Sequence, residues 1–199
     1  MKDKLIVLGY FIAAVMVFAS WFTMFSGHDT SSVLSIRGIR ALQYYTVDSN
    51  LFMGVAALVY IFSGKTPFSK VLVLCGTAVV CLTFLTVVCY LGPVMGYTRM
   101  FTGSNLYMHM IVPILSAALL ICNAGSTGLP LSSACLAGLP TAVYAVFYIR
   151  NVIKNGSEKD WYGLAKGGPK TYLPICLGFI GITILIAAIL WLISGGRSR

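Results

Sequence analysis

LIVLGYFIAAVMVFASWFTMF, residues Leu5 to Phe25, contains no charged side chain, and it decides what kind of protein this chain forms. A helix needs about 20 mostly apolar residues to cross roughly 30 Å of hydrocarbon. This run is long enough, it ends beside the interfacial pair Trp21-Phe22, and it lacks the small-x-small exit of a cleavable signal peptide. We therefore expect it to be a first membrane span.

The composition of the whole chain agrees with that reading. Of its 199 residues, 58% are hydrophobic and 10% are charged, whereas soluble domains have about 25% charged residues. The net charge of +9 suits the anionic headgroups of membrane lipids, and no basic stripe with interleaved aromatics suggests a nucleic acid partner. The six cysteines lie in or beside apolar runs without a CxxC pair, which predicts buried thiols rather than disulfides.

Five more apolar runs follow the first one. Backbone hydrogen bonds cannot stay open in lipid, so these runs must be helices. We expect an all-α, polytopic membrane protein, a single domain over residues 1–199, with six transmembrane helices in one bundle. Their approximate bounds are 5–25, 46–63, 71–95, 106–122, 131–152 and 171–193. The connection 26–43 has apolar residues at helical spacing, which predicts a short interfacial segment.

An even number of spans places both chain ends on one face of the membrane. Six lysines and arginines fall on that face and eight on the opposite one, a split too even for the positive-inside rule to give an orientation. The second, fourth and sixth spans all begin on the opposite face. Eight of the eleven tyrosines also fall there, so the polar chemistry is expected on one side of the membrane.

The second span opens with the polar run Thr46-Val47-Asp48-Ser49-Asn50. Thr46 has two readings: a helix cap followed by a carboxylate near the positive end of the dipole, or a nucleophile that needs a base. Ser49 and Asn50 share its helix face at i+3 and i+4. Asp48 is expected to point elsewhere, because it lies about 200° around the helix.

His109 is the one histidine within an apolar run. An ionisable group inside the membrane is a functional candidate by default, although a neutral imidazole that bonds a neighbouring helix is the plain alternative. Pro113 removes the hydrogen bond to the carbonyl of His109 and predicts a kink there. His109 lies about one turn inside the fourth span, and we expect it to face Thr46 at the same membrane depth.

The sequence lacks the residues that a metal site, a phosphate-binding loop or a soluble-hydrolase motif would need. One histidine and one aspartate in the apolar region are too few ligands for a metal site. The sequence contains no glycine-rich phosphate loop, no HExxH and no GxSxG motif. We expect no metal and no other cofactor.

Two stretches resemble a known family. Tyr45-Thr46-Val47-Asp48-Ser49-Asn50-Leu51 and Leu106-Tyr107-Met108-His109-Met110-Ile111-Val112-Pro113 are similar to the androgen-induced and androgen-dependent integral-membrane protein family, and Asp160-Trp161-Tyr162-Gly163 fits its bacterial relatives. The resemblance implies a six-helix threonine hydrolase of fatty acid esters of hydroxy fatty acids, with Thr46 and His109 as the catalytic pair. It also implies a bacterial cytoplasmic membrane protein.

Two hypotheses follow. The first is an intramembrane lipid esterase in which Thr46 attacks the ester, His109 is the general base, Ser49 or Asn50 holds the oxyanion, and Arg99 and Trp161 contact the substrate. The second is a small transporter or lipid-binding protein in which His109 and Asp48 line a polar pathway. Asp48 can instead pair with Arg40 or Arg99. The sequence does not give the natural substrate or the oligomeric state.

Overall fold

The structure, a computed structural model, describes residues 2–27, 38–123, 128–156, 160–164 and 168–196. These residues form helices and turns and no strand. Six helical segments are long and apolar enough to span a membrane: Lys2–Ser26, Tyr45–Ser63, Pro67–Met95, Ser104–Cys122, Ser133–Asn155 and Lys170–Ile193. The all-α, multi-pass bundle expected from the sequence is confirmed.

The second span packs between the first and the third. Helix α2 (Tyr45–Ser63) lies against both α1 (Lys2–Ser26) and α3 (Pro67–Thr86), and α3 continues through a π-helical turn, η2 (Val87–Leu91), and α4 (Gly92–Met95). The third span is the most enclosed of the six, with 61% of its apolar window buried, because helices surround it on several sides.

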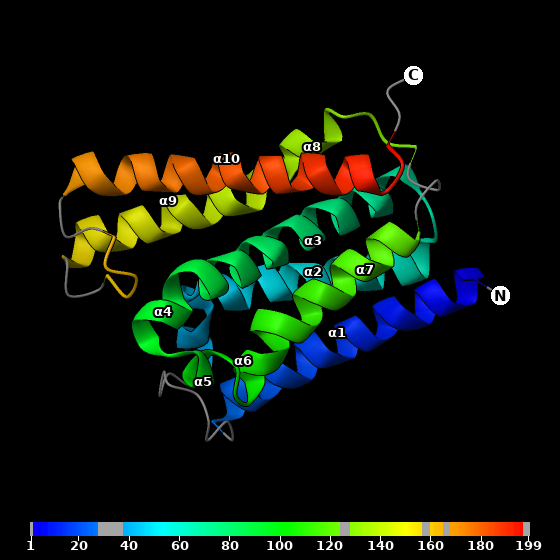
Figure 1. Ribbon diagram of the computed structural model, residues 1–199. Coiled ribbons are helices and arrows are strands. Elements are labelled where there is room, and N and C mark those ends of the chain that lie inside the picture. The colour runs from blue at the N-terminus through cyan, green and yellow to red at the C-terminus, as the bar shows by residue number, and fades with distance from the viewer. Residues whose placement is uncertain (1, 28–37, 124–127, 157–159, 165–167, 197–199) are drawn as a thin grey trace.

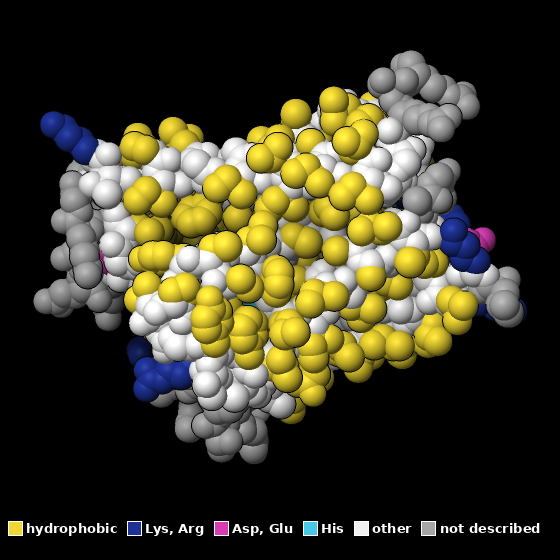
Figure 2. Space-filling view, viewed as in Figure 1, with side chains coloured by type: hydrophobic (Ala, Val, Ile, Leu, Met, Phe, Trp, Pro, Cys, Tyr) yellow, Lys and Arg dark blue, Asp and Glu magenta, His cyan; other side chains and the backbone are white. Residues whose placement is uncertain are grey.

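The remaining spans complete two sides of the bundle. The loop helix α5 (Tyr97–Met100) leads into the fourth span, which consists of α6 (Ser104–Leu106), a second π-helical turn, η3 (Tyr107–Ile111), and α7 (Val112–Cys122). After α8 (Ser133–Leu136), helices α9 (Gly138–Asn155) and α10 (Pro169–Ile193) lie side by side along α3 (Figure 1). Hydrophobic side chains cover the face in Figure 2, and lysines and arginines lie at its two ends.

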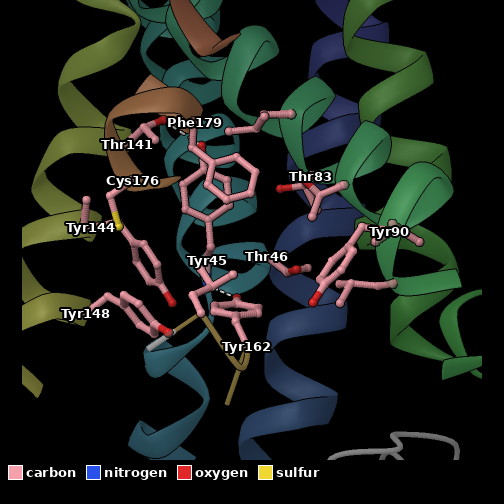
Figure 3. A pocket seen from close by; sticks show the side chains of 16 residues that line it. Tyr45, Thr46, Thr83, Tyr90, Thr141, Tyr144, Tyr148, Tyr162, Cys176 and Phe179 are labelled. Atoms are coloured by element: carbon pink, nitrogen blue, oxygen red, sulfur yellow. Dashed lines mark hydrogen bonds between the residues drawn. The ribbon is translucent and has the colours of Figure 1, made fainter. Parts of the chain in front are cut away.

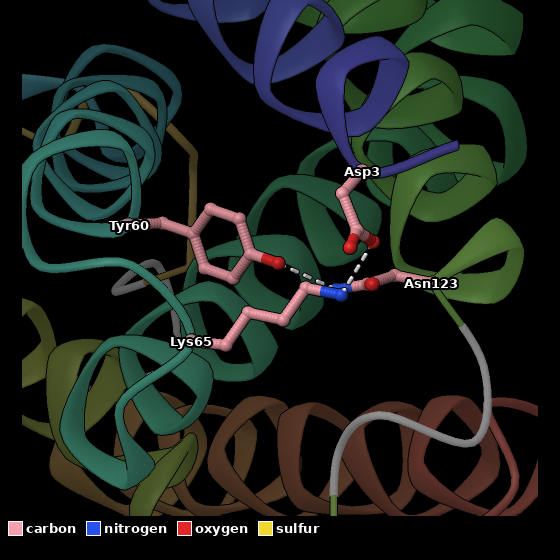
Figure 4. A network of polar contacts seen from close by, with 4 residues as sticks. All are labelled: Asp3, Tyr60, Lys65 and Asn123. Atoms are coloured by element: carbon pink, nitrogen blue, oxygen red, sulfur yellow. Dashed lines mark hydrogen bonds and ion pairs between the residues drawn. The ribbon is translucent and has the colours of Figure 1, made fainter. Parts of the chain in front are cut away.

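Both ends of the described chain lie at one end of the bundle (Figure 1). Polar contacts tie several helix ends together there (Figure 4): Lys65 Nζ lies 2.7 Å from Asp3 Oδ1, and Asn123 Nδ2 donates to Tyr60 Oη at 2.8 Å. These residues belong to the start of α1, the end of α2 and the end of α7. The start of the first span thus lies beside the ends of the second and fourth spans, as expected when each span crosses the membrane once. An exposed ion pair such as Lys65–Asp3 contributes little stability.

Several predicted helix ends were wrong. The third span begins at Pro67 instead of residue 71, because proline suits the first helical position and the Thr66 side chain caps the helix by accepting the Ser69 N–H at 3.2 Å. The fifth span extends to Asn155. The interfacial segment is a 3₁₀ helix, η1 (Gly38–Gln43), while positions 28–37 of that connection lie outside the described residues.

The two π-helical turns share one arrangement. In each, a proline follows the turn by two positions, Pro93 after η2 and Pro113 after η3, and removes the N–H that would bond the carbonyl of Cys89 or His109. The residue before each proline donates five residues back instead: Gly92 N–H bonds Val87 O, and Val112 N–H bonds Tyr107 O. The irregularity predicted at His109 is therefore a π-turn, a feature often found at functional sites.

Gly76 sets the distance between α2 and α3. A Cβ atom at this position would lie 2.9 Å from Met53 Sδ and 3.2 Å from Met53 Cα, and small residues allow such close approach in membrane bundles. We expect Gly76→Leu to lower the free energy of unfolding by about 1–3 kcal/mol, measured as the melting temperature in detergent. Gly178→Leu on α10 is the matched control, because nothing lies within 4 Å of its Cβ position. Equal melting temperatures would contradict this packing.

Candidate functional site

Thr46 does not cap its helix. The N-cap of α2 is Tyr44, whose side chain makes no capping bond, and the N–H groups of Val47 and Asp48 bond the Tyr44 carbonyl. Within the described residues the Thr46 hydroxyl makes no hydrogen bond, and it lines a pocket. The capping interpretation of Thr46 is therefore wrong, and its hydroxyl is available to a ligand.

The pocket lies at the face opposite the chain ends. It is enclosed by the start of α2, the end of α3 with η2, helices α9 and α10, and the loop 160–164, and its empty space measures about 690 Å³ including the open mouth. Figure 3 shows the Thr46 hydroxyl between the rings of Tyr162 and Tyr90. The lining residues are Tyr45, Thr46, Leu82, Thr83, Thr86, Val87, Tyr90, Leu91, Thr141, Tyr144, Ala145, Tyr148, Tyr162, Leu164, Cys176 and Phe179.

A chain of hydroxyls holds α9 and α10 against α2 beside the pocket. Thr183 Oγ1 donates to the Phe179 carbonyl at 2.8 Å, so it must accept from Thr141 Oγ1, 3.0 Å away. Thr141 in turn accepts from the Tyr45 hydroxyl at 2.8 Å. Each hydroxyl has one proton to donate, so the bonds run in one direction from Tyr45 to α10. This chain fixes the deep wall of the pocket.

The loop 160–164 closes the pocket on the side of the membrane face. The Asp160 carboxylate accepts the Tyr148 hydroxyl and the Leu164 N–H, and the Tyr162 hydroxyl accepts the Tyr45 N–H at 3.0 Å. That N–H is one of the first donors of α2, which have no acceptor within the helix. Tyr162 thus supplies the cap that α2 lacks and connects the Asp160–Gly163 motif to the start of the helix that carries Thr46.

Removing the Tyr162 hydroxyl should destabilise this junction. We expect Tyr162→Phe to lower the free energy of unfolding by about 1–3 kcal/mol, because the Tyr45 N–H loses its acceptor. Removal from water raises the pKa of the Tyr162 hydroxyl well above its usual range. The unfolded tyrosine ionises near pH 10 and the folded one does not. The free energy of unfolding of the wild type therefore falls above that pH, and its difference from that of Tyr162→Phe becomes smaller.

Thermal unfolding between pH 7 and 11 measures both effects. Tyr90→Phe is the matched control, since the Tyr90 hydroxyl makes no hydrogen bond within the described residues. If the two variants melt at the same temperature at neutral pH, Tyr162 does not cap α2.

His109 is buried on η3, and its protonation pattern follows from its partner. Nδ1 lies 2.8 Å from the Met100 carbonyl oxygen. A carbonyl only accepts, so Nδ1 carries the hydrogen and the lone pair of the neutral ring is on Nε2. An imidazole oriented in this way by a backbone carbonyl has its basic nitrogen available, as a general base requires.

Thr46 and His109 lie on neighbouring helical segments, but their side chains are not hydrogen-bonded within the described residues. Asn50, one turn after Thr46, donates through Nδ2 to the Thr46 carbonyl at 2.8 Å and to the Met108 carbonyl at 3.0 Å, so α2 is bonded to the residue preceding His109. No hydrogen bond joins the two side chains within the described residues, and no residue of the fourth span lines the pocket. The direct pairing is not observed, and the catalytic assignment of both residues stays a prediction.

The predicted oxyanion donors are engaged elsewhere. Ser49 Oγ donates to the Thr46 carbonyl at 3.1 Å and lies 2.9 Å from Thr83 Oγ1. The Asn50 amide nitrogen has the two acceptors given above, and its buried Oδ1 has no donor within the described residues. Neither side chain lines the pocket. Sharing a helix face with Thr46 does not bring these side chains to the pocket, because hydrogen bonds to neighbouring helices hold both of them elsewhere.

The other predicted substrate contacts also lie outside the pocket wall. Arg99 is exposed on α5, and the Trp161 ring packs against Tyr148 while its Nε1 donates to the Tyr144 hydroxyl at 3.3 Å. Asp48 is half-buried and, within the described residues, pairs with neither Arg40 nor Arg99. Neither the substrate role of Arg99 nor that of Trp161 has support from the geometry.

Sequence reasoning missed the residues that build the pocket. Five tyrosines and four threonines line it, and Tyr144 and Thr141 come from α9, for which no site was predicted. The signal was the concentration of tyrosines at one membrane face. Their convergence depends on how α9 and α10 pack on α3, which local patterns do not contain.

Comparisons with known proteins add no relative. No protein-family model, no curated protein and no solved structure matches this chain.

Proposed function

We propose that this protein is an intramembrane hydrolase of a lipid ester, with Thr46 as the nucleophile and His109 as the general base. One observation carries the proposal: the Thr46 hydroxyl makes no hydrogen bond within the described residues and borders an otherwise largely apolar pocket between helices. A hydroxyl without a capping role that borders an apolar pocket is placed for attack on a bound ester.

The reaction has two steps. Thr46 Oγ bonds to the ester carbonyl carbon, its proton passes to His109 Nε2, and the alcohol leaves with that proton. In the second step water attacks the acyl-threonine carbonyl carbon and gives a proton to His109 Nε2, and His109 passes that proton to Thr46 Oγ as the bond to the acyl group breaks and the fatty acid departs. The Nδ1 bond to the Met100 carbonyl orients the ring and stabilises the charge that it acquires in each step.

The start of α2 can stabilise the oxyanion. The N–H of Thr46 belongs to the first turn and has no acceptor within the described residues, while the Tyr45 N–H is occupied by Tyr162. The positive end of the helix dipole favours negative charge at this position. The side chains of Ser49 and Asn50 are not needed for this role.

The proposal requires His109 to approach Thr46 in the substrate complex. Catalytic hydrogen bonds are often long or absent without ligand and form when substrate binds. The η3 turn that carries His109 is an irregular helical segment, and the Asn50 bond to the Met108 carbonyl already joins it to α2. A small displacement of this segment is the conformational step that the mechanism implies.

The purified protein in detergent provides the direct test. We expect hydrolysis of a long-chain ester and covalent labelling by a fluorophosphonate, with mass spectrometry locating the label on Thr46. Heat-denatured protein is the control for spontaneous hydrolysis. A label on another residue, or no turnover of any long-chain ester, would contradict the assignment.

The absence of a Thr46–His109 hydrogen bond favours a second candidate, a lipid-binding protein or small transporter that uses the same pocket without chemistry. This reading predicts transfer of a lipid between liposomes, and it predicts that the transfer persists in Thr46→Ala. Hydrolysis that disappears in Thr46→Ala would reject it.

A further inference from the structure

The wall of the pocket carries no charge at neutral pH. Of its lining residues, the polar ones are tyrosines and threonines, and the others are leucine, valine, alanine, cysteine and phenylalanine. Several of the hydroxyls donate to other residues, but those of Thr46 and Tyr90 make no hydrogen bond within the described residues, and such a hydroxyl can donate to a carbonyl or ether oxygen. The hydroxyls of the wall offer no countercharge for a carboxylate or a phosphate, and an unpaired charge is costly to bury.

Within the described residues, two acidic side chains lie beside residues of the wall. Asp48 follows the pocket residue Thr46 by two positions and has no ion pair within the described residues. Asp160 accepts the hydroxyl of Tyr148, another pocket residue. The basic side chains that the structure describes on this face are exposed and do not line the pocket: Arg40, Arg99, Arg150, Lys154 and Lys170. An anionic group inside would therefore have no cationic side chain beside it among the residues that line the pocket.

The mouth of the pocket faces lipid. Tyr90 and Leu91 of η2 and Phe179 of α10 are lining residues from two sides of the pocket, and Tyr90, which is 45% exposed, also reaches the outer surface. Figure 2 shows the apolar face hollowed between α10 and the third span, with hydrophobic side chains around the hollow. An opening through this face leads into hydrocarbon.

We infer that the pocket takes a neutral lipid ester, which enters sideways from the bilayer between η2 and α10. An ester that carries a free carboxylate, as the fatty acid esters of hydroxy fatty acids do, is disfavoured there. The hydroxyl-rich end of the pocket holds the uncharged ester group, and the chains extend along apolar side chains toward the mouth. The chemistry rests on the proposed function, whereas the binding preference rests on the wall alone.

Photo-crosslinking in the Thr46→Ala variant tests binding without turnover. The probe is a wax ester with a diazirine in its acyl chain, offered to protein in lipid nanodiscs. The comparison probe is the same ester with a carboxylate at the end of its alcohol chain. We expect the neutral probe to label residues around Leu91 and Phe179 with at least about 10-fold higher yield, because each 1.4 kcal/mol of desolvation cost is a factor of ten in affinity.

A pair of neighbouring substitutions on α9 provides the control. Ala145 lines the pocket, so Ala145→Phe should fill it and reduce labelling by the neutral probe at least about 10-fold. Val146 is 65% exposed on the outer face of the same helix, so Val146→Phe should leave labelling unchanged. Equal labelling by both variants, or a label away from the pocket, would overturn the inference.

The outcomes separate this inference from the proposed function. Neutral-probe labelling in the pocket with no hydrolysis by the wild-type protein supports the inference and rejects the hydrolase. Hydrolysis that depends on Thr46 but shows equal labelling by both probes keeps the hydrolase and rejects neutral selectivity.

Discussion

Thr46→Ala is expected to lower the rate of ester hydrolysis at least about 10³-fold, because it removes the nucleophile that forms the acyl intermediate. Its effect on folding should be small, since the Thr46 hydroxyl neither caps α2 nor makes another hydrogen bond within the described residues. The measurement is turnover of a long-chain ester by purified protein, together with the melting temperature of each variant.

Two variants make this test specific. Thr46→Ser keeps a hydroxyl and should retain measurable activity, and Thr86→Ala removes another hydroxyl from the same pocket wall and should keep most of it. Comparable losses in Thr46→Ala and Thr86→Ala would show that the pocket matters for binding alone. Turnover at the wild-type rate in Thr46→Ala would reject Thr46 as the nucleophile.

The second large effect is expected at His109. His109→Asn places an amide N–H near the position of Nδ1, so the bond to the Met100 carbonyl can persist while the basic Nε2 is lost. We expect hydrolysis to fall about 10²–10⁴-fold, the contribution typical of a positioned general base, with little change in melting temperature.

His109→Ala separates the base from the structural bond. It removes both, leaves the Met100 carbonyl without its donor, and should cost about a further 1–3 kcal/mol of folding free energy. If His109→Asn hydrolyses the ester at the wild-type rate, His109 is a structural residue that joins η3 to α5, and Thr46 needs a different base.

Most of the fold follows from the sequence because lipid permits few structures. The six apolar runs had to be helices once their length and lack of charge were recognised. The errors lie at helix ends, where a single contact decides the boundary. Pro67 begins its helix four residues early because the Thr66 side chain caps it, and hydropathy does not register such a contact.

The site was predictable only in part. Pro113 correctly indicated an irregular backbone at His109, since a missing N–H has a local consequence. Thr46 was singled out, but its surroundings depend on α9, α10 and Tyr162, which lie far away in the sequence. No hydrogen bond joins Thr46 and His109 within the described residues, and the sequence could not decide whether they face each other, because depth along two helices does not give the rotation of either one.

The two π-turns change the rotation of each helix about its own axis. A π-turn accommodates one residue more than an α-helical turn does, and each residue corresponds to about 100° around an α-helix. In the fourth span, the side chains before η3 therefore do not continue the helix faces of the side chains after it. Deleting one residue from η3 would bring the two halves into phase and turn the start of the span, with its connection to α5, by about a quarter of a revolution relative to α7. The direction in which the His109 ring points thus depends on the number of residues in the turn as well as on the residue at position 109.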